Sequence, residues 1–278
     1  MKKLFFGALF LFFLTEAFVF HKTAMAFSLM SVPEQGNLLY GSVFEGERLF
    51  FDSQEIKISD DGRFVVALPY DAPEEVPFII RLKKREVAVF VPVKKRQWKK
   101  EKVTGLLNEK VVYSDEVQER ITRENQTVRQ ARAESTEEFF PVCFSMPLQG
   151  RISSEFASSR TLNDKVVQRH SGTDIAAKEG TPVKAPAAGF VRLAAKDFFL
   201  TGNTVVLDHG YGVFSSYSHL SEITVKEGKF VSKGQIIGKV GSTGRVTGPH
   251  LHWVLLWKGI RTDPLRAVAV SAELCPEK

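Results

Sequence analysis

Alternating apolar and polar residues mark several short strands in the first half of the chain. The clearest runs lie at 64–68, 78–82 and 87–93, and the first of them follows the turn sequence Asp60-Asp61-Gly62. Side chains of a strand alternate between its two faces, so each run presents one apolar face. Several such strands separated by turn residues predict a small antiparallel β-sandwich within residues 27–103. The region contains no histidine, and we interpret it as an accessory domain for binding or positioning.

The pattern then changes to a helical one. Residues 114–135 contain neither glycine nor proline, and their apolar residues recur at helical spacing behind the N-cap sequence Ser114-Asp115-Glu116. We predict a helix there, within a linker of residues 104–138. The preceding run KKRQWKKEK, residues 94–102, is strongly basic. It is typical of a solvated strand edge or linker, and contact with an anionic glycan or membrane surface is the alternative.

Regular glycines and short apolar runs fill the second half of the chain. A Gly-x-x-Val sequence followed by Gly-x-Val occurs within residues 180–191 and again within 228–240. Glycines at this spacing are typical of turns between paired strands. They predict a compact antiparallel β domain over residues 139–278, so the fold class of the whole chain is mainly β. A biotinyl- or lipoyl-type carrier would show the same glycines, but no lysine lies in the motif that such a carrier requires.

The first 26 residues are typical of a secretory signal peptide. Lys2 and Lys3 precede the apolar run LFFGALFLFFL, and Ala24-Met25-Ala26 has the small residues that a signal peptidase recognises. An uncleaved signal that anchors the chain in the inner membrane is the alternative. We therefore expect an exported protein, most readily in the periplasm.

Composition and net charge further restrict the class of protein and its partners. The 278 residues are 44% hydrophobic and 25% charged, which is typical of a globular protein, and the formal net charge is +6. A mildly basic exported chain is attracted to a carboxylate-bearing cell wall or to lipid headgroups, and export excludes nucleic acid as a partner.

Cys143 and Cys275 are the only cysteines. In an oxidising compartment they form either a disulfide or two unpaired buried thiols, and the sequence leaves both open.

Five of the six histidines lie in the C-terminal half. His250 and His252 are two apart in the apolar run LHWVLL, so a strand places both on one face. An isolated H-x-H is also compatible with two hydrogen-bonded structural histidines. His170 and Asp174 lie in HSGTDI, where extended backbone also places both on one face. Two histidines and a carboxylate are a donor set that holds catalytic zinc and leaves a position open.

Three motifs in order carry a resemblance to a known family. HSGTDIA, SYSHL and GPHLHW resemble the signature of the lysostaphin/LytM-type peptidoglycan metallopeptidases, and the intervening GTPVKAPAAGFV and VVLDHGYG resemble that family's strands and turns. The resemblance covers residues 140–264. It implies a zinc-dependent endopeptidase that hydrolyses peptide crosslinks of bacterial peptidoglycan in cell-wall remodelling. Both D-alanyl–diaminopimelate and glycine-containing crosslinks fit this implication.

The resemblance also implies roles for individual residues. His170, Asp174 and His252 would bind Zn²⁺. His219 and His250 would be catalytic, one accepting a proton from the attacking water and the other stabilising the oxyanion, with no indication of which does which.

Other residues near the motifs receive weaker assignments. Arg160 and Asn163 resemble positions that line the family's cleft, which implies that they hold carboxylate or carbonyl groups of the substrate. The alternative is that both residues only order their loop. His209 lies in the turn sequence DHGYG, which favours a structural role in hydrogen bonding to the backbone. Strand alternation would place Ser215, Tyr217 and His219 on one face, with Tyr217 as a wall of the site or a support behind the metal-binding residues, and with a catalytic role as the alternative.

Two alternatives concern the whole chain. A non-catalytic protein of the same fold would bind peptidoglycan or activate an amidase, and such proteins typically lack metal-binding residues that are present here. The domain order also raises the hypothesis that the N-terminal sandwich and the 114–135 helix cover the cleft and keep the enzyme latent. The predicted partner is peptidoglycan, with transient contact to an anionic membrane surface; the sequence sets no oligomeric state.

Overall fold

A computed structural model describes residues 27–275 apart from 45, 84, 104–112, 139, 142 and 163–165. The predicted signal peptide, residues 1–26, therefore lies outside the described residues. Within the described part of the chain, no helix combines the length and the apolar character needed to cross a membrane.

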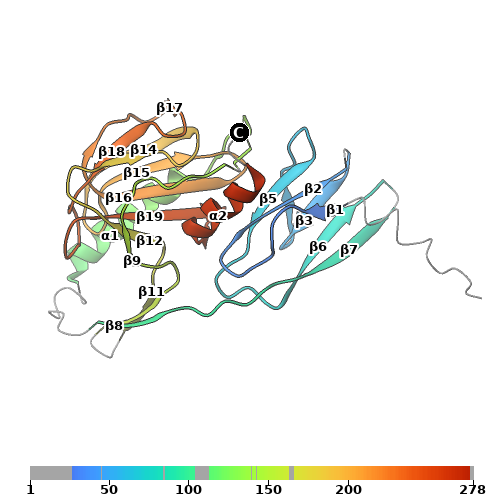
Figure 1. Cartoon of the computed structure of the whole chain (residues 1–278), viewed down its shortest axis with the longest axis horizontal. Coiled ribbons are helices and arrows are strands. Elements are labelled where there is room, and N and C mark those ends of the chain that lie inside the picture. The colour runs from blue at the N-terminus through green and yellow to red at the C-terminus, as the bar shows by residue number, and fades with distance from the viewer. Residues whose placement is uncertain are drawn as a thin grey trace, which may run out of the picture.

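The N-terminal region consists of two small antiparallel sheets. The first contains β1 (Phe27–Leu29), β2 (Leu38–Val43) and β5 (Arg63–Ala67). The second has the order β4-β3-β6-β7, with β3 (Arg48–Phe51), β4 (Gln54–Ile56), β6 (Glu75–Arg81) and β7 (Glu86–Pro92). Aromatic rings join the two sheets: Phe64 and Phe78 have ring centroids 5.9 Å apart. Alternating apolar residues thus form a sandwich core, and the predicted sandwich is confirmed (Figure 1).

The C-terminal region is built on one large antiparallel sheet with the main strand order β17-β14-β15-β16-β19-β12-β9. In chain order its strands are β9 (Arg151–Ser154), β12 (Thr173–Ala176), β13 (Pro182–Lys184), β14 (Gly189–Phe198), β15 (Gly202–Asp208), β16 (Val213–Ile223), β17 (Phe230–Val231), β18 (Ile236–Val240), β19 (His250–Trp257) and β20 (Ile260–Thr262). The strands β13, β18 and β20 pair beside this path. The mainly β fold class is confirmed.

The two faces of this sheet pack against different elements. On one face Tyr217 of β16 and Trp253 of β19 are fully buried in a core. On the other face Phe214 and Val254 form a smaller cluster, against which Val128 of α1 packs. The helix α1 (Asp115–Gln130) begins at Ser114, whose side chain accepts a hydrogen bond from the Val117 amide. It lies within the predicted 114–135 segment and lies over the second face of the sheet (Figure 1).

The basic run connects the two regions. It continues from β7 along one side of the molecule into β8 (Lys100–Val103), which pairs in parallel with β10 (Ser159–Leu162) (Figure 1). β10 in turn pairs with β11 (Val166–Arg169), so β8 is an edge strand of a small sheet. Trp98 packs edge-on against Phe156 and donates to the Tyr70 carbonyl. The tryptophan of the run therefore contributes to packing between the two regions.

A shared core fixes the two regions to each other, and a disulfide joins the two ends of the C-terminal region. The cluster around the sandwich continues into the C-terminal region, where Phe51 meets Trp257 with ring centroids 6.4 Å apart. The helix α2 (Pro264–Leu274) contributes Ala267 and Val270 to the same cluster. Cys143 and Cys275 form a disulfide with Cα atoms 5.8 Å apart, which decides between the two alternatives left by the sequence. The predicted domain boundaries remain a prediction, since the regions share this core.

Candidate metal centre

Strand register brings the three predicted metal-binding residues together. β12 and β19 are antiparallel neighbours in which Asp174 lies directly opposite His252, so both side chains are on one face. His170 lies just ahead of β12, separated from it by Ser171 and Gly172. Position 172 requires glycine, because a Cβ atom there would be 2.3 Å from the Trp253 carbonyl oxygen. A residue without a side chain lets the HSGTD segment approach β19 closely enough for His170 to reach Asp174.

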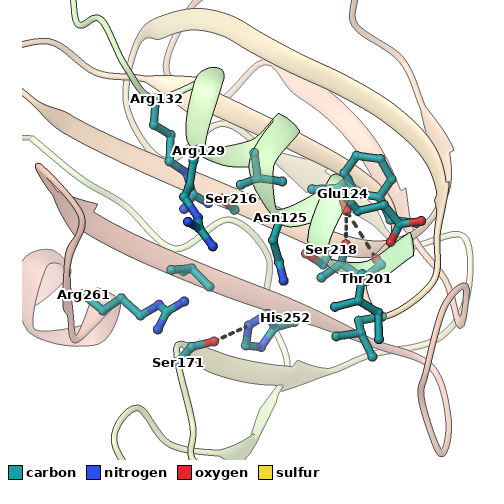
Figure 2. A pocket seen from close by; sticks show the side chains of 16 residues that line it. Glu124, Asn125, Arg129, Arg132, Ser171, Thr201, Ser216, Ser218, His252 and Arg261 are labelled. Carbon is teal, nitrogen blue, oxygen red and sulfur yellow. Dashed lines mark hydrogen bonds between the residues drawn. The ribbon is translucent and has the colours of Figure 1, made fainter. Parts of the chain in front are cut away.

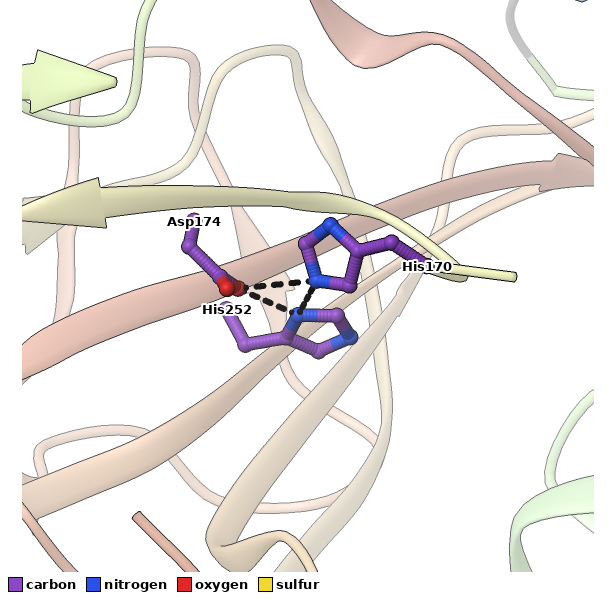
Figure 3. A group of neighbouring side chains, drawn as sticks. All are labelled: His170, Asp174 and His252. Atoms are coloured by element: carbon purple, nitrogen blue, oxygen red, sulfur yellow. Dashed lines mark hydrogen bonds and ion pairs between the residues drawn. The ribbon is translucent and has the colours of Figure 1, made fainter. Parts of the chain in front are cut away.

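Three atoms of these residues converge (Figure 3). The Nε2 atom of His170 lies 3.1 Å from Asp174 Oδ1, His252 Nδ1 lies 2.8 Å from the same oxygen, and the two nitrogens are 3.2 Å apart. Donor atoms bound to one tetrahedral zinc at ~2.0–2.1 Å are roughly 3.3 Å from one another. The observed separations are close to this value.

The surroundings of the donors leave their lone pairs facing each other. His170 Nδ1 lies 2.9 Å from the Glu155 carbonyl oxygen, which can only accept, so this nitrogen carries the hydrogen. The neutral ring then presents a lone pair at Nε2 toward the Asp174 carboxylate. His252 Nε2 lies 3.2 Å from Ser171 Oγ, and this hydroxyl can orient the second ring in the same way. Lone pairs this close need a cation or extra protons between them, so the donor set fits a metal ion.

Electrostatics keep the same groups in the form that binds a metal. Burial raises the pKa of Asp174, but when the facing ring nitrogens carry protons in place of a metal ion, hydrogen bonds from His170 and His252 outweigh burial and hold that pKa far below its ordinary value. Burial lowers the pKa of His252, which favours the neutral imidazole. An ionised carboxylate and neutral imidazole are the protonation states that coordinate zinc.

The two further histidines lie beside this cluster. The His250 and His219 rings have centroids 4.8 Å apart, and His250 Nε2 is 3.9 Å from Asp174 Oδ1. Each Nδ1 faces a backbone carbonyl, that of Gly248 for His250 at 2.8 Å and that of Thr243 for His219 at 2.9 Å. A carbonyl only accepts, so each Nδ1 carries hydrogen and each Nε2 is the atom available for chemistry. Burial lowers the pKa of His219 to about 4.

The alternation expected along β16 is wrong at its end. Ser215 and Tyr217 do share a face, and the Tyr217 hydroxyl is 2.7 Å from Ser215 Oγ. That face is the core opposite the metal centre, so Tyr217 forms no wall of the site. His219 leaves this face because its φ of 65° is in the left-handed region, at an irregularity of the sheet. The change of backbone conformation turns its imidazole toward His250 and His252.

The remaining sequence assignments have different outcomes. His209 is fully buried with Nδ1 at 2.8 Å from the Ala188 carbonyl oxygen, which confirms a structural role in hydrogen bonding to the backbone. Arg160 is on β10, which pairs with β11, the strand directly before His170, and its role in substrate binding remains a prediction. Asn163 lies outside the described residues, and its role remains a prediction too.

A second set of residues next to the metal centre was not found from the sequence. A cavity of about 270 Å³ lies between α1 and the second face of the sheet, and its lining includes Ser171 and His252 (Figure 2). Arg129 and Arg132 enter it from α1 and the residues after it, and Arg261 enters from β20. The three-residue spacing of Arg129 and Arg132 was the only sequence signal, and surface helices commonly have such pairs.

Similar proteins share both the fold and the motif-bearing segment. Residues 168–264 match peptidase family M23. A crystal structure titled as an M23 peptidase from Pseudomonas aeruginosa superposes with a TM-score of 0.67 at 30% identity, covering 87% of this chain and 96% of that one. The protein described here belongs to peptidase family M23.

Two curated relatives match the C-terminal half of the chain. Peptidoglycan DD-endopeptidase ShyA of Vibrio cholerae is 44% identical over 130 residues, which are 46% of this chain and 30% of the relative. DD-carboxypeptidase/endopeptidase Mpg of Neisseria meningitidis is 40% identical over 124 residues, 45% of this chain and 28% of the relative. The chain thus matches less than a third of the length of these relatives.

Proposed function

We propose that this protein is a zinc-dependent endopeptidase that hydrolyses peptide crosslinks of bacterial peptidoglycan in cell-wall remodelling. The observation that carries the proposal is the convergence of His170, Asp174 and His252 with their lone pairs facing one another. Membership of a peptidase family, and relatives named as peptidoglycan endopeptidases, supply the substrate class.

The three residues would hold zinc through His170 Nε2, Asp174 Oδ1 and His252 Nδ1. Bound there, zinc would supply Lewis-acid polarisation of the peptide carbonyl and would make water a stronger acid. Hydrogen bonds from the rings to the Glu155 carbonyl and to Ser171 fix the orientation of both imidazoles before substrate binds.

His219 and His250 supply the remaining acid–base chemistry. Both rings are held by a backbone carbonyl at Nδ1, so a proton is gained or lost at Nε2. One ring accepts a proton from the attacking water at this atom. The other, protonated at Nε2, donates a hydrogen bond to the oxyanion that develops on the scissile carbonyl. Backbone anchoring holds both rings in place without any rearrangement during the reaction.

Two further features support an exported hydrolase. The Cys143–Cys275 disulfide is typical of an oxidising compartment, which agrees with export to the periplasm. The complete donor set, with both additional histidines beside it, favours a hydrolase over a non-catalytic protein that binds peptidoglycan or activates an amidase. Peptidoglycan is therefore the proposed partner, as substrate.

The test combines metal content with activity on purified cell wall. We expect about one zinc per wild-type chain by elemental mass spectrometry and release of soluble muropeptides. Asp174→Asn and His252→Ala should lose zinc and release none, as should chelated wild type. Asp197→Asn is the matched control, because its carboxylate is 97% exposed and belongs to β14 outside the site.

Two results would contradict the proposal. Muropeptide release by His252→Ala or by fully chelated protein would refute the zinc mechanism. Zinc binding without any release by wild type would instead favour the non-catalytic alternative. Mass spectra of products from defined muropeptides would identify the bond that is cut.

A further inference from the structure

Three arginines gather in the cavity beside the metal centre without any acidic partner. Arg129, Arg132 and Arg261 line it together, and among the described residues none of them pairs with a carboxylate (Figure 2). The one acidic residue in the lining, Glu124, already accepts hydrogen bonds from Arg120 and from the Phe199 amide. The positive charge of the cavity is therefore not balanced from within the protein.

Arg132 is the deepest of the three. One of its terminal nitrogens donates to Ser216 Oγ, while its Nε atom is buried and has no hydrogen-bond partner. Burial and the nearby charge of Arg261 lower the pKa of Arg132 to about 10. Burying an unsatisfied donor and placing like charges together both cost free energy, which a bound anion would recover.

The cavity belongs to the same cleft as the metal centre. Ser171, whose hydroxyl contacts His252 Nε2, and His252 itself are part of the lining. Arg129 on α1 and Arg261 on β20 are both solvent-exposed, so a ligand can reach them from outside. An anionic group of a bound peptide can thus lie in the cavity while a neighbouring part of that peptide lies at the metal centre.

We propose that Arg129, Arg132 and Arg261 form a subsite that binds a free carboxylate of the peptide substrate. The proposal rests on the proposed function, because that function makes the ligand a peptidoglycan stem peptide. Guanidinium groups are planar and donate pairs of parallel hydrogen bonds that match the two oxygens of a carboxylate. The subsite would select stems whose carboxyl groups are free over stems in which they are amidated, and it makes α1 part of the substrate-binding cleft.

The test measures binding first, so that it does not depend on catalysis. An uncrosslinked stem tetrapeptide is titrated into the zinc-loaded mature chain, once with free carboxyl groups and once with those groups amidated. We expect the free acid to bind wild type about tenfold more tightly, the scale of charge-assisted hydrogen bonds at an exposed site. The double variant Arg129→Gln/Arg261→Gln should bind both peptides alike. Arg123→Gln is the matched control, since Arg123 is an exposed arginine of α1 outside the cavity.

Hydrolysis of a crosslinked peptide then separates this subsite from a structural role. The double variant should show a raised KM for the free-acid crosslink with little change in kcat. Equal binding of acid and amide by wild type, or a preference that persists in the double variant, would overturn the subsite even if hydrolysis is normal. A carboxylate preference that the variant abolishes, without hydrolysis by wild type, would support the subsite and refute the proposed function.

Discussion

At the scale of single residues, the backbone at His219 decides the composition of the site. Its φ of 65° is uncommon for a residue with a side chain, and such conformations persist where surrounding structure enforces them. Here the neighbouring chain is close: a Cβ atom at Gly241 would lie 2.8 Å from the His219 carbonyl oxygen and 2.3 Å from the Ser221 nitrogen. The strained conformation brings the ring to the metal centre, which regular strand geometry would not do.

This strain predicts a difference between two inactive variants. His219→Gly and His219→Ala should both lose muropeptide release, because neither has an imidazole. Glycine adopts a positive φ without steric cost, so His219→Gly should be more stable than His219→Ala by about 1 kcal/mol. Urea unfolding of the two proteins measures the difference. Greater stability of the alanine variant would show that the backbone at this position is not strained.

At the scale of elements, α1 is a long helix with few buried residues that nevertheless lines the cleft. Only Ile121 is buried on it. Arg120 pairs with Glu124 and also donates to the Asp197 carbonyl oxygen of β14, while Glu124 accepts a hydrogen bond from the Phe199 amide. None of the described residues of the sandwich lines the cavity, whereas several residues of α1 do. Of the two segments proposed to cover the cleft, α1 is thus the one beside it, and the proposed arginine subsite would give α1 a role in binding instead.

A role of α1 in substrate binding and a role in keeping the enzyme latent predict opposite changes in kcat/KM when the helix is loosened. Ile121→Asn replaces the buried apolar side chain of α1 by an uncharged amide and should loosen the helix without adding a charge to the cavity. If α1 carries part of the subsite, KM should rise by about tenfold with little change in kcat. Gln126→Ala, an exposed position of the same helix, is the control. A higher kcat/KM in Ile121→Asn would instead support the hypothesis that α1 keeps the enzyme latent.

At the scale of the whole molecule, the two regions behave as one packed unit. Phe51 and Trp257 meet across the shared core, Tyr40 donates to the Pro141 carbonyl, and Arg96 pairs with Asp263. The disulfide connects the segment before the large sheet to the end of α2, across a sequence separation of 132 residues. The aromatic packing, the hydrogen bond and the ion pair keep the sandwich fixed relative to the metal centre, and the disulfide closes the C-terminal region on itself.

The disulfide gives a prediction at this scale. Cys143→Ser/Cys275→Ser should lower the free energy of unfolding by about 2–4 kcal/mol, since a crosslink that closes a long loop restricts the unfolded chain. Zinc content at 25 °C should not change, because neither cysteine belongs to the cluster of His170, Asp174 and His252. Urea unfolding of the variant and of oxidised wild type gives the comparison. Equal stability would mean that the shared core alone holds the two ends together.

The sequence by itself predicted the main elements of this protein and the candidate donors of a metal centre. Alternation predicted strands, the Ser114 cap predicted the helix, the H-x-H and HSGTD spacings placed candidate donors on shared faces, and the family resemblance selected His252 from the pair. These are local properties, because strand periodicity and capping depend on neighbours within a few residues.

Only the tertiary structure decided the rest. The face on which His219 lies depends on a bulge and on the close approach of Gly241, and the choice between a disulfide and two free thiols depends on a distance across 132 residues. The cavity with Arg129, Arg132 and Arg261 exists because α1 packs over β16 and β19, elements far from it in sequence. Packing between distant segments has no local sequence signal. In the sequence the three arginines resemble ordinary solvated surface residues, and only the folded chain brings them together as a candidate binding site.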